Sequence, residues 1–221
     1  MKEKLIVMLT HHDVTVKNAK ETFEACKDLP VQNWGFKDVG LEPEDMKELC
    51  QLMKFSGKTT FLEVVTYSEL ECMRGAQLAV ECGFDYLAGT IFYDSVLDYI
   101  KQHDVKYCPF VGRVSGSPSV LKGTVEFCVN QAEVYAKKGV YGIDLLGYRY
   151  AEGDPEVFSQ EIAVRCQLPV IMAGSIDSQE RIEVVRKMNP WTFTMGSALF
   201  DKKFVKDGTF RENLEKVVSL L

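Results

Sequence analysis

Apolar runs of strand length alternate with amphipathic helical segments along the whole chain. Eight runs predict strands, at residues 5–10, 31–40, 59–66, 85–92, 106–114, 142–149, 169–175 and 191–197. Each run is followed by a segment with helical periodicity. Because strict alternation of strand and helix requires parallel strands covered by helices, the pattern predicts an α/β fold.

Start and stop signals delimit the predicted helices. Pro43 stands in a first turn, and Asp94 and Asp154 are candidate N-caps. Glycine follows three helical segments, at positions 57, 83 and 139. No linker divides the chain, so we predict one domain over residues 1–221. Eight nearly equal units fit a closed (β/α)8 TIM barrel better than an open doubly wound sheet.

Composition and charge narrow the classes of partner. The chain has 221 residues, 46% hydrophobic and 26% charged, and its net charge of −6 gives a nucleic-acid partner no electrostatic support. No apolar run approaches the ~18–20 residues that cross a membrane. The seven cysteines are scattered without metal-site spacing, which favours reduced thiols in a cytoplasmic protein. No GxGxxG follows a strand, so we expect no cofactor, although a barrel can also hold the phosphate of FMN.

Two Gly-Ser turns follow the seventh and eighth predicted strands. They contain Gly174 and Ser175, then Gly196 and Ser197. In a TIM barrel the loops after these two strands form the usual phosphate site, and glycine lets backbone N–H groups approach an anion. We therefore predict that these four residues bind phosphate without needing a lysine. Close packing of strand on helix is the alternative explanation of the glycines.

The same stretches carry a resemblance to a known group. IMAGSIDSQERI followed by TFTMGSALF resembles the phosphate-binding end of the ribulose-phosphate-binding barrel superfamily. That group includes the phosphoribosyl isomerase of histidine synthesis, N-acetylmannosamine-6-phosphate epimerase and thiamine-phosphate synthase. The motif match covers the last quarter of the chain, and Ala-Gly-Ser-Ile replaces the usual Gly-Gly-Ile-like turn. The resemblance implies a barrel acting on a phosphorylated small molecule, but no single family's catalytic residues are all present.

Three charged residues within the predicted strands are candidates for catalysis. Lys37 could act as a Schiff-base nucleophile or stabilise an enolate. Glu63 lies in the apolar run FLEVVT and needs a polar environment or a cation, for which Lys37 is the candidate. Asp144 is expected across the barrel mouth from Glu63, which would give the two groups that proton transfer requires. Structural ion pairing is the alternative, and alternation forbids Lys37 and Asp38 from both pointing inward.

Further candidates stand on the predicted rim of the barrel. Arg113 ends the fifth predicted strand and could bind a second anionic group. It precedes the Gly/Ser/Pro-rich stretch VSGSPSVLKGT, which we predict to be a lid. Tyr148 and Arg149 follow the sixth strand and could complete the wall of the site.

His11, His12 and Asp13 follow the first predicted strand and raise the question of a metal. Adjacent histidines usually point in different directions, and no third ligand stands at a helpful spacing. We therefore expect no metal site and assign His12 as a candidate general acid.

These observations favour an enzyme acting on a small phosphorylated sugar or keto compound. Isomerisation or epimerisation by acid–base proton transfer is the leading reaction. A Schiff-base aldolase or lyase using Lys37 is the first alternative, and a non-catalytic sugar-phosphate-binding barrel is the second. Assembly into a homo-oligomer stays open.

Overall fold

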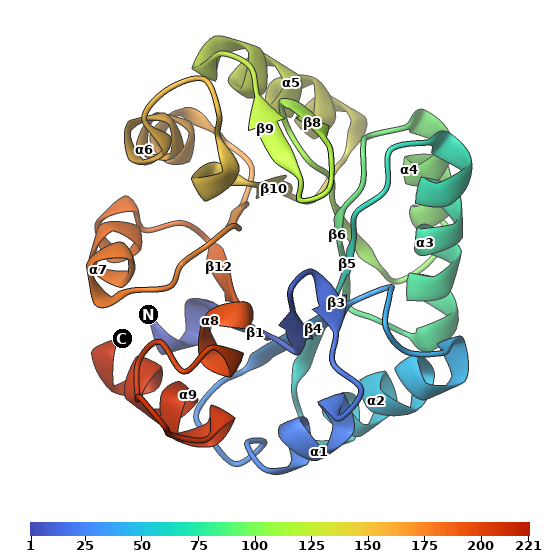
Figure 1. Cartoon of the computed structure of the whole chain (residues 1–221). Coiled ribbons are helices and arrows are strands. Elements are labelled where there is room, and N and C mark those ends of the chain that lie inside the picture. The colour runs from blue at the N-terminus through green and yellow to red at the C-terminus, as the bar shows by residue number, and fades with distance from the viewer.

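Eight parallel strands curve around a common axis with helices on the outside (Figure 1). The computed structural model describes every residue, from Met1 to Leu221. Around the sheet the strand order is β10-β11-β12-β1-β4-β5-β6-β7. The bounds of these strands are β1 Leu5–Met8, β4 Asn33–Lys37, β5 Thr59–Val64, β6 Tyr86–Gly89, β7 Lys106–Cys108, β10 Ile143–Leu145, β11 Val170–Met172 and β12 Thr192–Met195.

The sheet closes between its two end strands, β7 and β10. The backbone N–H of Asp144 donates to the carbonyl of Pro109 at 2.9 Å, and Phe110 forms a parallel bridge with Asp144. Strand β7 ends at Cys108 because the proline that follows has no N–H to donate to a ladder. The (β/α)8 TIM barrel predicted from the sequence is confirmed.

Helices follow the strands and cover the outer surface of the barrel. Two single 3₁₀ turns, η1 (Lys2–Lys4) and η2 (Gly147–Arg149), accompany the α-helices. The α-helices are α1 Ala19–Glu24, α2 Pro43–Phe55, α3 Glu69–Cys82, α4 Asp94–Ile100, α5 Val125–Lys138, α6 Pro155–Arg165, α7 Gln179–Met188, α8 Ser197–Phe200 and α9 Phe210–Leu220. No helix combines the length and the apolar character that crossing a bilayer would require.

Local signals explain most of the helix ends. The Asp154 carboxylate accepts bonds from the first N–H groups of α6, as predicted for an N-cap. Gly83 and Gly139 take left-handed conformations directly after α3 and α5. The prediction that Asp94 is the N-cap of α4 was wrong. Tyr93 is the N-cap, and the Asp94 carboxylate accepts a hydrogen bond from Lys138.

The interior of the barrel changes character from one end to the other. Apolar side chains fill the end where the strands begin, among them Phe61 and Tyr86, whose rings stack with centroids 4.5 Å apart. Side chains alternate along a strand, so Glu63 faces inward two residues beyond Phe61. Lys37 stands opposite Glu63 in the register of β4 with β5. The charged side chains Lys37 and Glu63 therefore lie near the carboxyl ends of their strands.

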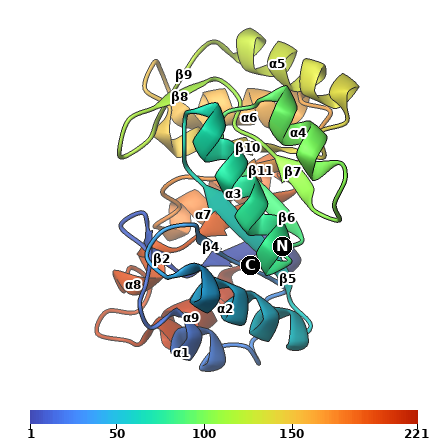
Figure 2. The same cartoon turned by 90° about the vertical axis from the view of Figure 1, so that its right-hand side faces the viewer.

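Two short hairpins stand beyond the strand ends and extend from the same end of the barrel (Figure 2). Strands β2 (Thr10–His11) and β3 (Val14–Thr15) form the first hairpin. Strands β8 (Arg113–Ser115) and β9 (Val120–Lys122) form the second. The predicted strand 106–114 is thus too long, and the predicted lid loop is a paired hairpin that starts at Arg113.

All seven cysteines are free thiols. Six are buried, and only Cys166 is partly exposed. Burial raises the pKa of the Cys26, Cys82 and Cys128 thiols to about 11, which keeps them protonated at neutral pH. The cysteines act as small apolar side chains in the core.

Candidate active site at the barrel mouth

One cavity opens at the mouth of the barrel, where the strands end. Both Gly-Ser turns line it, and so do charged side chains from two barrel strands and two of the loops that follow strands. The turn residues are Gly174, Ser175, Gly196 and Ser197, and the charged residues include Asp13, Lys37, Glu63 and Arg149. The cavity therefore combines backbone-rich turns with a set of acids and bases.

Lys37 is the centre of this set of charged side chains. Its side chain is 8% exposed, and its ammonium donates to Asp13 Oδ1 at 2.7 Å. The same Nζ lies 3.6 Å from Glu63 Oε1, so the predicted pairing with Glu63 is confirmed. Arg149 donates from Nη2 to the same Asp13 oxygen at 2.9 Å. One carboxylate oxygen thus bridges two cations.

The network fixes the charge of Lys37. Burial alone would lower the pKa of this ammonium, but Glu63 and Asp13 outweigh burial and raise the pKa above its ordinary value. Burial would likewise raise the pKa of Asp13, but the hydrogen bonds from Lys37 and Arg149 lower it. At neutral pH the site holds a protonated lysine beside an ionised Asp13.

Asp144 lies in the barrel interior and does not line the cavity. It is 1% exposed, and its Oδ1 atom has no hydrogen-bond partner. Burial raises the pKa of this carboxyl well above its ordinary value, and the charge of Glu63 raises it further. Burial therefore favours the neutral form of Asp144, which senses the charge of Glu63 but does not line the cavity.

Asp38 points away from the site, as alternation along the strand requires. Lys37 lines the cavity, whereas Asp38 does not. Burial raises the pKa of the Asp38 carboxyl to about 6, and the charge of Glu63 adds to the effect. The sequence left open which of the two faces the mouth, and the structure shows that it is Lys37.

Packing by itself explains why both turns contain glycine. Gly174 has φ of +120°, and a Cβ there would lie 3.1 Å from the Cβ of Tyr148. A Cβ on Gly196 would lie 2.8 Å from Thr10 Oγ1 and 2.9 Å from Thr10 O. The steric requirement holds with or without a ligand, so the case for phosphate rests on the cavity that both turns line.

Two cations near these turns were not assigned from the sequence. Lys203 lines the cavity in the loop after α8, and it has no ion-pair partner. The Arg181 guanidinium lies 4.7 Å from the centroid of the Tyr148 ring and pairs with Asp177 at 3.0 Å. It also donates to the carbonyl of Ser175. Lys203 is therefore available to bind an anion, whereas Arg181 stabilises the turn that contains Ser175.

Arg113 lies outside the cavity. Its side chain is 62% exposed, stands 3.9 Å from Glu152 and covers the ring of Phe127 at 5.2 Å. The structure therefore does not bring Arg113 to the other candidates. The hairpin that begins with it does reach the mouth, because Pro118, Ser119 and Val120 line an outer hollow together with His12 and Arg149.

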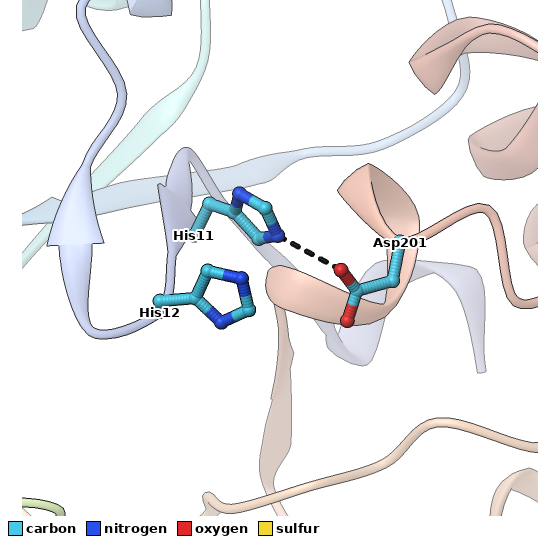
Figure 3. Close-up of side chains that lie close together, drawn as sticks. All are labelled: His11, His12 and Asp201. Carbon is cyan, nitrogen blue, oxygen red and sulfur yellow. Dashed lines mark hydrogen bonds and ion pairs between the residues drawn. The ribbon is translucent and has the colours of Figure 1, made fainter.

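The histidines after β1 lie at the rim and converge with a distant carboxylate (Figure 3). Their rings are stacked with centroids 3.8 Å apart. His11 Nε2 lies 2.8 Å from Oδ1 of Asp201, a residue that also lines the cavity. His12 borders only the outer hollow. The sequence gave no signal for Asp201, because 190 positions separate it from His11.

The comparisons with known proteins agree on the fold. No protein-family model matches the chain, and no curated protein does either. Orotidine 5'-phosphate decarboxylase from Pyrococcus horikoshii has a similar structure, with a TM-score of 0.71, 12% identity and 98% of each chain covered. N-acetylmannosamine-6-phosphate 2-epimerase from Clostridium perfringens is also similar, with a TM-score of 0.65 and 12% sequence identity. The match covers 98% of this chain and 92% of the epimerase chain.

A third similar structure is described as a regulatory protein. The glycerol uptake operon antiterminator regulatory protein from Listeria monocytogenes has a TM-score of 0.60 at 16% identity, with 89% of this chain and 93% of that chain covered. These identities support a common fold and nothing finer. They agree with the (β/α)8 barrel that the sequence predicted, and the chain is such a barrel with a charged mouth.

Proposed function

We propose that this barrel is an enzyme that acts on a small phosphorylated sugar or keto compound by acid–base proton transfer. The observation that carries the proposal is the single cavity shared by two features. The two Gly-Ser turns and the Lys37–Glu63 pair both line it. A phosphate held at the turns would direct the carbon chain of the ligand toward these charged groups.

The charges define a role for each group. Lys37 is protonated and held by Asp13, so it can stabilise the negative oxygen of an enediolate. Glu63 faces the cavity 3.6 Å from that ammonium and is the group suited to remove a proton next to a carbonyl. Returning the proton to the neighbouring carbon would convert an aldose into a ketose, and returning it to the same carbon from the other face would epimerise it.

The remaining candidates support this pair. Arg149 and Lys37 share Asp13, which fixes the lysine head between two carboxylates. Asp144 lies below the cavity, so its proposed part is to limit the charge around Glu63 by remaining neutral. His12 stays a candidate general acid at the rim, because it borders the outer hollow.

A Schiff-base aldolase or lyase is the weaker alternative. A lysine nucleophile has to lose its proton. Burial favours this loss by lowering the pKa of the ammonium, whereas a neighbouring carboxylate raises that pKa. Lys37 has two carboxylates within 3.6 Å. Trapping with borohydride in the presence of substrate separates the reactions, since only an imine at Lys37 would give a covalent adduct.

The first experiment tests phosphate binding. Thermal unfolding of the protein is followed with inorganic phosphate, sulfate and a panel of sugar phosphates. The variant is Ser175→Asp, because Ser175 is exposed at the cavity, whereas Gly196→Asp would force a Cβ against Thr10. Ser219→Asp on α9, remote from the mouth, is the matched control. A ligand at 100 times its Kd stabilises by about 2.7 kcal/mol.

The expected result is stabilisation of the wild type and of Ser219→Asp by one sugar phosphate, and its loss in a folded Ser175→Asp variant. Absence of any shift in the wild type would overturn phosphate binding. Exchange of substrate hydrogens with D2O, followed by NMR on the ligand that binds, then tests proton transfer.

A non-catalytic barrel is the second candidate, favoured by the fold likeness to the antiterminator regulatory protein. It predicts tight binding of a sugar phosphate by the wild type with no hydrogen exchange and no turnover. Binding that survives Glu63→Gln, together with an inactive wild type, would favour this reading over an enzyme.

A further inference from the structure

Three metal-ligating side chains meet at the rim of the cavity, outside the charged network (Figure 3). They are His11 and His12 from the β2–β3 hairpin and Asp201 after α8. One ligand atom from each lies within 4.8 Å of the other two. The sequence argument against a metal assumed that adjacent histidines diverge and that no third ligand exists, and neither holds in the folded chain.

The local backbone explains why the two rings converge. His12 and Asp13 occupy the hairpin turn with positive φ of 49° and 64°. This left-handed pair turns the chain back within two residues, and the β2–β3 ladder holds the turn in place. The His12 N–H donates to Ser197 Oγ at 3.1 Å, which joins the turn to the start of α8. The hairpin and the α8 segment therefore hold the three ligands on one rim.

An ion pair explains only part of this arrangement. His11 and Asp201 bond at 2.8 Å, which accounts for those two residues. The His12 ring makes no hydrogen bond and stacks on His11, so its nitrogens are free to bind a ligand. No lysine or arginine pairs with Asp201, so the carboxylate is also available.

We propose that His11, His12 and Asp201 bind one divalent transition-metal ion of the Zn²⁺ class. Metal binding through the neutral imidazole of His12 would replace the general-acid role considered for this residue. Imidazole nitrogens with one carboxylate are a ligand set that Zn²⁺ accepts, with a position left for an exogenous ligand. Bond lengths of ~2.0–2.1 Å bring neighbouring ligand atoms to about 3.3 Å apart in tetrahedral geometry. Binding would require rotamer changes of the three side chains, of which His12 and Asp201 are exposed and His11 is partly exposed.

The open position of the ion would face the cavity. Asp201 and Ser197 both line the cavity, next to the turn proposed to hold phosphate. A phosphate or hydroxyl oxygen of the ligand is the natural fourth donor, and this part of the inference rests on the proposed function. Metal binding itself depends only on the three side chains, so it can fail or succeed independently.

The test is titration of the whole protein with Zn²⁺ by calorimetry and with Co²⁺ by visible absorption. Asp201→Asn keeps the shape of the side chain, and His12→Asn keeps a residue type that tolerates positive φ. His103→Ala removes the one other histidine of the chain, which contacts Tyr99 on α4, and is the matched control. Circular dichroism and thermal unfolding confirm that each variant is folded.

The expected result is one ion per chain in the wild type and in His103→Ala. Each ligand variant should bind at least about tenfold more weakly. Binding without saturation at one ion, unchanged affinity in both ligand variants, or thiolate-to-Co²⁺ bands that identify cysteine ligands would each overturn the site.

Inorganic phosphate added to the Co²⁺-loaded protein tests the open position. A change in the Co²⁺ spectrum that Ser175→Asp abolishes supports phosphate as the fourth ligand. A spectrum that does not change while phosphate still stabilises the protein overturns only the link between the two sites.

Discussion

Lys37 and Glu63 are neighbours both in backbone register and in side-chain contact. Their Cα atoms are partners across β4 and β5, and Nζ lies 3.6 Å from Oε1. Two strands that pair in parallel thus present a cation and a carboxylate at the same depth of the barrel. The pair needs no loop to assemble it, because the regular part of the sheet sets its geometry.

Glu63→Gln is expected to abolish proton transfer while leaving the fold and ligand binding intact. The amide keeps the size of the side chain but cannot accept a proton, and general-base catalysis contributes about 10²–10⁴ in rate. Exchange of substrate hydrogens in D2O should fall at least about 100-fold. Glu24→Gln on the exposed face of α1 is the control, and exchange at the wild-type rate in Glu63→Gln would exclude Glu63 as the base.

Asp38→Asn is expected to stabilise the protein at neutral pH. Burial raises the pKa of Asp38 from 3.8 to about 6 in the folded state, so the folded chain binds more protons than the unfolded chain between these values. Stability therefore falls as pH rises through this window, by at most about 3 kcal/mol. The amide introduced by Asp38→Asn is uncharged at every pH, so the variant avoids this loss of stability.

Urea denaturation at about pH 4 and about pH 7.5 measures the effect of Asp38→Asn. The difference between the variant and the wild type should grow toward the higher pH. An equal difference at both pH values would mean that Asp38 is not the titrating group.

Asp144→Asn is expected to stabilise the protein at pH 7, because the folded state disfavours the ionised carboxyl that the unfolded chain carries. Burial, and next to it the charge of Glu63, raise the pKa of Asp144 well above its ordinary value, and an amide at this position removes the cost of burying the charge. Asp85 offers the contrast, because it accepts bonds from Thr60 N and Oγ1, each at 2.8 Å, and from Lys54. Burial would raise the pKa of Asp85, but these bonds lower it.

Asp85→Asn should therefore cost about 1–3 kcal/mol, because it weakens bonds to a charged acceptor. Both variants are compared with the wild type by urea denaturation at pH 7. A loss above about 2 kcal/mol in Asp144→Asn would show that Asp144 is ionised and paired in the folded protein.

Tyr67→Phe is expected to loosen the β8–β9 hairpin without disturbing the barrel. The Tyr67 hydroxyl bonds to the carbonyl of Gly116 at 2.7 Å and to Ser119 Oγ at 2.9 Å. Losing these bonds costs about 1 kcal/mol and frees the segment that borders the outer hollow. Hydrogen exchange should quicken in residues 113–122, whereas Tyr99→Phe should leave this segment unchanged. Unaltered protection in Tyr67→Phe would remove the hairpin from any lid role.

Periodicity in the sequence predicted the barrel well because the signal repeats in every unit. The pairing of Glu63 with Lys37 was predictable because an acid within an apolar strand needs polar surroundings or a cation, and Lys37 stands on the neighbouring strand. The fifth strand was predicted too long because Phe110, Val111 and Val114 continue the apolar pattern after the ladder stops. Pro109 was the available signal, since its ring nitrogen has no hydrogen to donate.

The rim was less predictable because it depends on long-range contacts. Asp201 meets His11 only after the chain has closed the barrel and turned through α8. Arg113 stood at the end of an apolar run, but the hairpin that follows turns it outward to Glu152 and Phe127. Neither the Asp201–His11 contact nor the outward position of Arg113 could be predicted from the hydrophobic periodicity, because tertiary packing sets where loop residues lie.

The turn between β2 and β3 concentrates two chemistries in adjacent residues. His12 belongs to the rim cluster, and Asp13 anchors Lys37 and Arg149. Turns with positive φ at both central positions favour Asn-Gly over His-Asp. An Asn-Gly replacement would thus preserve the hairpin and erase both functions at once. The same replacement would leave Lys37 and Glu63 in their strands, so it would separate what the turn contributes to the site from what the barrel strands contribute.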